Sequence, residues 1–218
     1  AEIPDAAGFV WTHKYGAPHW ADDATHAALQ GMSAILAGSE TFDANTLRDA
    51  TALKVIARNG VGYDKVDLDA CTERGIVVTY TPGVMADAVA DLSMALLLGA
   101  VRHIATGDRI IKSGGYDVPI GEDLPSMTLG AEAVDRDTLL AEADAISLHV
   151  PMSADNANVV NAQFLAAMRP GSYLINTARG GLVDEKALLA ALQSGHLAGA
   201  GLDCQATEPP VGVSAELV

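Results

Sequence analysis

The sequence is poor in cysteine and in basic residues. Among 218 residues the only cysteines are Cys71 and Cys204, with no Cys-x-x-Cys pair. This is typical of free thiols in a cytoplasmic protein. Only 13 Lys and Arg oppose 28 Asp and Glu, for a net charge of −15. Because a phosphate backbone needs a basic surface, we expect no nucleic-acid partner, and an anionic substrate must be held by local donors.

Long hydrophobic runs and a targeting pattern are also missing. The longest apolar run, Met94–Val101, is too short to span a bilayer, and the start Ala1–Asp5 lacks the basic region of a signal peptide. We therefore expect no membrane partner and a cytoplasmic location. Half of the residues are hydrophobic and 19% are charged, which is typical of a globular protein with one large or two modest domains.

Short apolar runs alternate with helical patterns along the chain. The expected strands are Ala34–Ala37, Lys54–Ala57, Ile76–Thr79, Ala145–Leu148, Tyr173–Asn176 and Ala200–Asp203. The expected helices between them are Thr46–Ala50, Asp67–Arg74, Thr138–Ala143, Asn161–Met168 and Asp184–Gln193. This order predicts an α/β fold with parallel sheets covered on both faces.

A long helix is expected from about Ala86 to Ile110. Its apolar residues surround most of the circumference, so we expect it to be buried on several sides, between domains or between subunits. We place the domain boundary here, between residues 1–85 and residues 86–218.

The segment Asn176–Asp184, Asn-Thr-Ala-Arg-Gly-Gly-Leu-Val-Asp, is the most informative motif. Arg179 follows the end of an expected strand, and ligands of open α/β sheets bind just outside those ends. A guanidinium there can hold a carboxylate through two parallel hydrogen bonds. Taken alone, a surface arginine in a glycine-rich turn is the more frequent explanation.

Two further segments also place polar groups after strands. Glu208 lies in a loop five residues after Asp203, where a carboxylate can orient an imidazole and raise its pKa, although a glutamate before proline is usually a solvated turn residue. The segment Arg58–Asp64 places two glycines after a strand, as in loops whose backbone N–H groups bind anions; a plain turn is about equally plausible.

In this order, the three segments resemble the D-2-hydroxyacid dehydrogenase family. The resemblance includes Thr81–Val84, Asp87–Asp91, His149–Met152 and Met168–Gly171, and it runs from about Ala24 to Pro210. Within the family, the Thr-Pro-Gly-Val segment is most similar to glyoxylate/hydroxypyruvate and 2-ketogluconate reductases.

The resemblance implies two Rossmann-like domains with a cleft between them. Residues 1–85 would form the substrate-binding catalytic domain, and residues 86–218 the long dimerisation helix and the nucleotide-binding domain. The implied activity is NAD- or NADP-dependent interconversion of a small 2-oxo acid and its D-2-hydroxy acid by hydride transfer, in a homodimer.

The resemblance also assigns roles to residues. Arg179 would bind and polarise the 2-oxo acid, and Glu208 would support the catalytic histidine. The residues that would hold the substrate carboxylate are Asn59, Gly60, Val61 and Gly62. The residues that would bind the cofactor are His149, Val150, Pro151, Thr177, Ala178, Arg179 and Asp203. No metal is implied, and Ala86 stands where relatives often have a threonine.

Two family features are missing. No G-x-G-x-x-G follows Met127–Gly130, so the acid that distinguishes NAD from NADP is missing too, and no histidine follows Pro210. The six histidines present are expected to be structural or solvated. We expect the sequence to omit mobile stretches at Gly130–Ala131 and at Pro210–Val211; the alternative is an inactive member with real deletions.

Other functions remain open within the same family. Some relatives are NAD-sensing transcriptional corepressors rather than enzymes, but no partner-binding tail is visible here. Phosphoglycerate dehydrogenase would need a regulatory domain or a basic phosphate pocket, and neither is visible.

Overall fold

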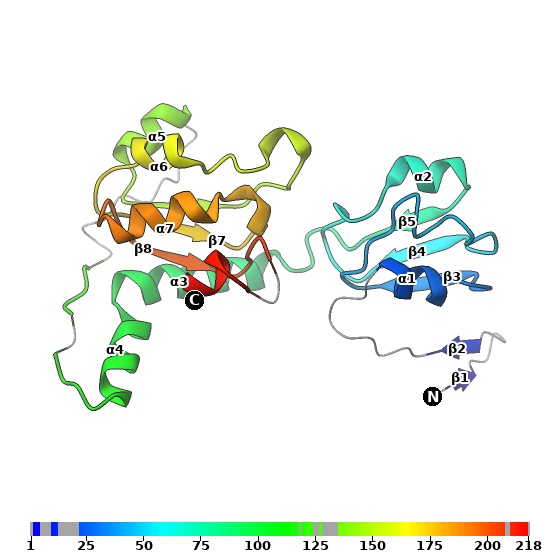
Figure 1. Ribbon diagram of the computed structural model, residues 1–218, viewed down its shortest axis with the longest axis horizontal. Coiled ribbons are helices and arrows are strands. Elements are labelled where there is room, and N and C mark those ends of the chain that lie inside the picture. Colours follow the sequence, from blue (N-terminus) through cyan, green and yellow to red (C-terminus); the bar gives the residue numbers. More distant parts are fainter. Residues whose placement is uncertain are drawn as a thin grey trace. The chain divides into compact units, whose positions relative to one another are not determined.

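A computed structural model shows a chain of two compact units, Ala1–Met85 and Ala86–Val218 (Figure 1). The structure describes residues 2–4, 10–12, 22–117, 119–123, 127, 135–207 and 210–217. Each unit contains a parallel three-stranded sheet with helices, so the α/β class with parallel Rossmann-like sheets is confirmed.

The first unit is built on the parallel sheet β3-β4-β5, formed by Ala34–Ala37, Val55–Arg58 and Val77–Thr79. Its helices are α1 (Asp22–Ala28) and α2 (Leu68–Glu73). A separate antiparallel pair, β1 (Glu2–Pro4) and β2 (Val10–Thr12), was not predicted. The core gathers buried side chains from the sheet and the segments around it, including Leu29, Phe42, Leu47, Leu53, Ile56 and Cys71.

The second unit is built on the parallel sheet β6-β7-β8, formed by Ala145–Leu148, Ser172–Asn176 and Leu197–Leu202. The central strand β7 is buried along its whole length. Its side chains alternate between two cores: Tyr173 and Ile175 pack with α3 (Ala86–Val101), whereas Leu174 packs into the larger core on the other side. The helices α5 (Arg136–Glu142), α6 (Ala162–Ala167) and α7 (Glu185–Gln193) contribute to this larger core (Figure 1).

Polar side chains begin the helices where the sequence predicts them. Asp67, Asn161 and Asp184 accept hydrogen bonds from the first backbone N–H groups of α2, α6 and α7. After α7, Gly195 has a φ of 72°, in the left-handed region that favours glycine. The starts and ends of these helices therefore depend on neighbouring residues, so they can be predicted from the sequence alone.

The helix predicted for Thr46–Ala50 is wrong. The residues form turns instead, in which Arg48 and Ala50 bond to carbonyls three residues back. Asp43 and Thr46 exchange side-chain and backbone hydrogen bonds at the start, with Asp43 Oδ1 accepting from Thr46 N at 2.7 Å. Such local bonds compete with an α-helix.

The single helix predicted for Ala86–Ile110 is also wrong. The chain forms α3 and α4 (Ile104–Lys112), with a bend of 58° between them. The break lies at His103, whose φ of 52° is left-handed and cannot continue a right-handed helix. Only Ser93, Leu97 and Val101 of α3 are buried, and α4 buries none of its residues. Among the described residues of the second unit, α3 is therefore buried along one face only, and its burial between domains or between subunits stays a prediction.

Among the described residues, no single helix is long and apolar enough to cross a bilayer. By length and composition alone, α3 and α4 pass this test only as a bent pair.

Candidate active site

The three strands of the second unit end side by side. Leu148 of β6 pairs with Asn176 of β7, and Asn176 pairs with Leu202 of β8. Because the strands are parallel, the residues that follow them, His149, Thr177 and Asp203, leave the sheet at one edge. This is the edge where open α/β sheets bind ligands.

Asn176 determines the shape of the turn that carries Arg179. Its side chain is 1% exposed, and both of its polar groups are used. The amide oxygen accepts a hydrogen bond from Ala178 N at 3.0 Å, and the amide nitrogen donates to Arg179 O at 2.9 Å. Its backbone carbonyl accepts from Asp203 N at 2.9 Å, which ties the end of β7 to the end of β8. The turn is thus fixed from one buried side chain.

Arg179 lies at the start of the short 3-10 helix η3 (Gly180–Leu182). Its side chain is half-buried, and Nη1 donates to Ala178 O at 2.8 Å. This bond folds the guanidinium back over its own turn, outside the carboxyl end of β7. A planar guanidinium in this position can bind a carboxylate or polarise a carbonyl oxygen.

Thr177 is joined to the first helix of the unit. Its hydroxyl and that of Ser93 on α3 lie 2.9 Å apart, and the Ser93 hydroxyl also donates to Val89 O at 2.7 Å. Ser93 is buried at 7% exposure. Thr177 was predicted at the cofactor site, but Ser93 was not, because a lone serine within an apolar helix carries no local signal.

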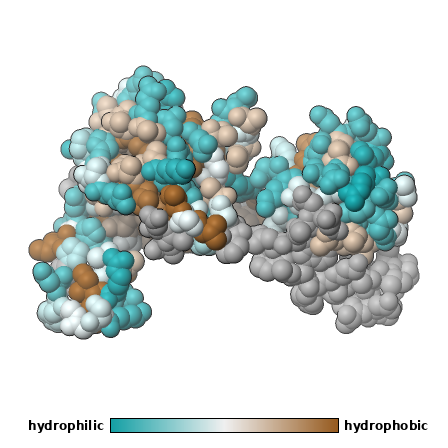
Figure 2. Space-filling model, in the orientation of Figure 1, coloured by the Kyte–Doolittle hydropathy of each residue, from teal (hydrophilic) through white to brown (hydrophobic). Residues whose placement is uncertain are grey.

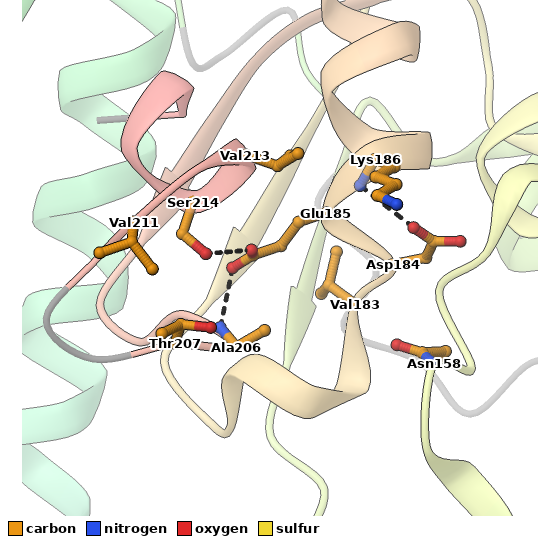
Figure 3. Close-up of a pocket in the computed structure, with 10 residues that line it drawn as sticks. All are labelled: Asn158, Val183, Asp184, Glu185, Lys186, Ala206, Thr207, Val211, Val213 and Ser214. Carbon is orange, nitrogen blue, oxygen red and sulfur yellow. Dashed lines mark hydrogen bonds between the residues drawn. The ribbon is translucent and has the colours of Figure 1, made fainter.

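A second set of contacts braces the segment after β8. Glu185, the first residue of α7, accepts hydrogen bonds from Ala206 N at 2.8 Å and from the Ser214 hydroxyl (Figure 3). A cavity of about 470 Å³ lies beside this carboxylate. The cavity is lined by Asn158, Val183, Asp184, Glu185, Lys186, Ala206, Thr207, Val211, Val213 and Ser214. No role was predicted for Glu185 or Ser214 from the sequence.

The segment after β6 is more open. His149, Val150 and Pro151 are exposed, and the His149 ring lies 2.8 Å from the Ser147 hydroxyl. The Pro151 carbonyl accepts a hydrogen bond from the side chain of Asn156 at 2.8 Å. These residues leave the same sheet edge as Thr177 and Asp203, as the order of the strands requires.

The segment predicted to hold a substrate carboxylate follows β4 in the first unit. It consists of Asn59, Gly60, Val61 and Gly62. Backbone bonds join this loop to both neighbours: Asn59 N donates to Ala37 O at 2.8 Å, and Thr81 N donates to Gly60 O at 3.0 Å. Arg58 closes the loop by donating from Nε to Gly62 O at 3.1 Å. The loop thus lies at the carboxyl edge of its sheet.

The predicted site residues of the second unit are brought together in part. One edge of the sheet β6-β7-β8 carries Thr177, Ala178, Arg179, Asp203 and the His149–Pro151 segment. Glu208 lies outside the described residues, as do Gly130 and Ala131 at the first expected interruption.

Two histidines have side-chain contacts that suit the structural roles expected for them. The His26 ring lies 3.1 Å from Thr46 O, and the His196 ring lies 3.0 Å from Leu165 O. His103 begins α4. Among the described residues, no group of three or more metal-ligating side chains is found.

Comparison with known proteins identifies the class. Residues 9–168 match the catalytic domain of the D-isomer specific 2-hydroxyacid dehydrogenases, and residues 123–216 match the NAD binding domain of the same enzymes. The chain therefore belongs to the D-isomer specific 2-hydroxyacid dehydrogenase family.

Individual relatives agree with this assignment. The chain is 37% identical to a glyoxylate reductase of Thermococcus litoralis, over 78% of this chain and 66% of the relative. It is 36% identical to a D-3-phosphoglycerate dehydrogenase of Mycobacterium bovis, over 87% of this chain and 44% of the relative. The crystal structure of the TT0316 protein from Thermus thermophilus superposes with a TM-score of 0.79 and 33% identity, covering 91% of this chain and 75% of that one.

The chain is shorter than these relatives. It spans less than two thirds of the length of either curated relative named above. The alignment with the phosphoglycerate dehydrogenase runs over 235 positions, more than the 218 residues of this chain, yet includes only 87% of them. That relative therefore has internal residues without a counterpart here, which agrees equally with an incomplete sequence and with real deletions.

Proposed function

We propose that the complete protein reduces a small 2-oxo acid to its D-2-hydroxy acid with NADH or NADPH. The observation that carries the proposal is the turn Asn176–Arg179 at the carboxyl edge of β6-β7-β8. There a fully buried asparagine fixes the backbone on both sides of an arginine. Family membership and the similarity to a glyoxylate reductase support the same activity.

In this proposal, Arg179 binds the acid and polarises its 2-oxo group. Two N–H groups on one planar guanidinium suit a carboxylate, and a fixed positive charge stabilises the oxygen as it gains electron density. The backbone of Asn59–Gly62 holds the substrate carboxylate. Glu208 keeps a histidine basic enough to transfer the proton; no histidine follows Pro210 in this sequence.

The residues present fit one half of a dinucleotide site. Thr177, Ala178 and Asp203 share the sheet edge with the exposed segment His149–Pro151, so nicotinamide-side and adenosine-side residues are adjacent. The glycine-rich turn that would hold the pyrophosphate has no counterpart in the sequence. When bound, NADH or NADPH would supply the hydride. The residues present do not distinguish NAD from NADP.

Replacing Arg179 with lysine tests the proposal. Lysine keeps the charge but loses the planar pair of donors, so kcat/KM should fall by about 30- to 1,000-fold, equivalent to about 2–4 kcal/mol. The matched control is Arg169→Lys, because Arg169 lies on the same unit, its side chain is 53% exposed, and it pairs with the carboxylate of Asp144 rather than lying at the sheet edge. Unchanged kinetics in Arg179→Lys would remove this arginine from the active site.

The activity itself is tested with full-length protein and a panel of 2-oxo acids that includes glyoxylate and hydroxypyruvate. Oxidation of NADH or NADPH by at least one acid is expected. If a cofactor binds but no acid is reduced, the proposed reduction is overturned, and the alternative of an NAD-sensing regulator of the same family is favoured.

We further propose a homodimer formed through α3 and α4. Several apolar side chains on these helices are exposed, including Met94 at 44%, Ile104 at 61% and Ile111 at 52%. Hydrophobic residues (brown) are visible on the surface over α4 in Figure 2. A symmetric dimer would cover them. Light scattering should give the mass of a dimer, and Ile104→Glu with Ile111→Glu should give a monomer.

The two free cysteines support a cytoplasmic location.

A further inference from the structure

The carbonyl groups of the loop after β4 point into the first unit. Gly60 O accepts a hydrogen bond from Thr81 N at 3.0 Å. Two residues further on, Gly62 O accepts one from the side chain of Arg58, through Nε at 3.1 Å. The loop is therefore held by its acceptors, and one of them depends on a charged side chain.

The donors of the same loop are left over. In the part of the chain that the structure describes, the backbone N–H groups of Val61, Gly62 and Tyr63 form no hydrogen bond. Val61 and Tyr63 are 44% and 45% exposed, so a ligand can reach this stretch. Consecutive free N–H groups at the carboxyl edge of a sheet suit an anion.

The bond from Arg58 fixes the direction of one of these donors. In a planar trans peptide the C=O and N–H groups point in opposite directions. Because Gly62 O points at the Arg58 guanidinium, the N–H of Tyr63 in the same peptide unit points away from it. A cationic donor on the carbonyl also polarises this peptide unit, which makes its N–H a stronger donor.

The Arg58 guanidinium is otherwise poorly satisfied. Its Nη1 atom is buried and has no hydrogen-bond partner. None of the ion pairs formed between described residues includes Arg58. A partly buried charge without a counter-ion is costly, so its presence needs an explanation. An anion bound at the free N–H groups would supply the missing charge across a single peptide unit.

We infer that Arg58 is a positioning residue that directs the Tyr63 N–H toward the carboxylate of the substrate. Its positive charge, behind the same peptide unit, is balanced when that carboxylate binds. Arg58 itself does not touch the substrate. The inference rests on the proposed function for the role of the loop as the carboxylate site, and it adds Tyr63 N–H to the donors predicted there.

The test uses full-length protein labelled with nitrogen-15 tyrosine and titrated with oxalate, a small dicarboxylate that has no keto group. The amide signal of Tyr63 is identified by its loss in Tyr63→Phe. This signal should shift as oxalate is added, and the shift gives a Kd. In Arg58→Met, which removes the charge and the donor, the Kd should rise about tenfold, because a hydrogen bond to a charged group contributes about 1.5 kcal/mol or more. Arg58→Lys, which keeps the charge, should lie between Arg58→Met and wild type.

Arg74→Met is the matched control. The Arg74 side chain also donates to a backbone carbonyl, Ala70 O at 3.0 Å, in the same unit. It follows α2 and precedes β5, so it lies at the opposite edge of the sheet from the loop. Oxalate should bind this variant with the wild-type Kd.

Kinetics separate positioning of the loop from general damage to the fold. In Arg58→Met, KM for the 2-oxo acid should rise about tenfold, whereas KM for NADH or NADPH should stay within about twofold and kcat within about threefold, as for loss of an interaction that holds the substrate throughout the reaction. A merely structural role would instead lower kcat or raise both KM values.

Each result decides the inference. A Tyr63 amide signal that does not respond to oxalate in the unmodified protein overturns it, and so does a wild-type Kd in Arg58→Met. If Arg58→Met does not fold, a wild-type Kd in Arg58→Lys together with a wild-type KM for the 2-oxo acid overturns it instead. If oxalate shifts the Tyr63 signal and Arg58→Met weakens binding, but no 2-oxo acid is reduced, the proposed function fails and the role of Arg58 in carboxylate binding stands.

Discussion

The carboxyl edges of the two sheets are held in different ways. In the second unit, side chains brace the edge of β6-β7-β8: Asn176 bonds to both sides of the turn, and Ser93 bonds to Thr177. In the first unit, backbone groups tie the loop after β4 to its neighbours, through Asn59 N to Ala37 O and Thr81 N to Gly60 O, and one side chain, that of Arg58, donates to Gly62 O within the loop. Both sheets are parallel and three-stranded, yet the two edges depend on different atoms.

The difference follows from what each edge has to present. A turn that presents a side chain, such as Arg179, must fix the direction of a Cα–Cβ bond, and buried side-chain hydrogen bonds can do this. A loop that presents backbone N–H groups to an anion depends on its own backbone geometry. We therefore expect loss of the bracing side chains to damage the edge of the second unit, and loss of the exposed Asn59 side chain to spare the loop of the first.

The largest effect is expected for Asn176→Ala. The substitution removes both hydrogen bonds of a buried amide and leaves Ala178 N and Arg179 O without that partner. The free energy of unfolding should decrease by about 2–4 kcal/mol, because each buried group left unpaired costs about 1–3 kcal/mol. Urea denaturation measures the change. Asn176→Asp, which keeps the acceptor and loses the donor, should also destabilise; a loss under about 0.5 kcal/mol in both variants would contradict the role given to Asn176.

A smaller effect is expected for the bond between Ser93 and Thr177. Ser93→Ala and Thr177→Val should each lower the free energy of unfolding by about 1 kcal/mol, since each removes one partly buried hydrogen bond. The double variant should cost less than the sum of the two single variants, because they remove the same bond. Additive losses in this cycle would show that the two hydroxyls do not interact. Thr177→Ser, which keeps the hydroxyl, is the control.

Much of the fold follows from local sequence signals. The strands Ala34–Ala37 and Ala145–Leu148 were predicted with their observed bounds, because both are short apolar runs between turns. The start of α7 at Asp184 was also predicted, since an acidic N-cap before Ala and Leu at helical spacing is a local pattern. Such features depend only on neighbours along the chain.

The errors have a different origin. The helix break at His103 was missed because histidine gives no breaking signal, and the apolar pattern continues on both sides of it. Glu185 was missed because its partners, Ala206 and Ser214, lie 21 and 29 residues away in the sequence. Contacts of this kind depend on the packed fold, and spacing alone does not give them.

One turn of the first unit departs from the backbone pattern and gives a pH-dependent test. The carboxylate of Asp43 accepts a hydrogen bond from Thr46 N at 2.7 Å, and this bond is the largest cause that lowers the pKa of Asp43. Because the pKa is lower in the folded state than its unfolded value of about 3.9, the stabilisation is complete above that value. It is lost as the pH falls through the folded pKa.

Asp43→Asn should therefore weaken the dependence of stability on pH below about pH 4. The amide keeps one acceptor oxygen, so the stability at pH 7 should change less than in Ser93→Ala. Urea denaturation of both proteins at about pH 7 and about pH 3, on either side of the unfolded pKa, measures this difference. An equal loss of stability in Asp43→Asn and wild type between the two pH values would show that the Asp43 bond contributes nothing.

The smallest effect is expected in the loop after β4, and it is the sharpest test of the contrast between the two edges. Asn59→Ala is the same chemical change as Asn176→Ala, but the Asn59 side chain is exposed, and its bond to Ala37 is made by backbone N. The free energy of unfolding should therefore change by less than about 0.5 kcal/mol.

Since the loop is proposed to hold the carboxylate through backbone N–H groups, KM for the 2-oxo acid should also stay near the wild-type value. Val61→Pro, which removes one of those N–H groups, should raise KM. If Asn59→Ala raises KM as strongly as Val61→Pro does, the side chain of Asn59 takes part in binding, and the two sheet edges do not differ in the way proposed.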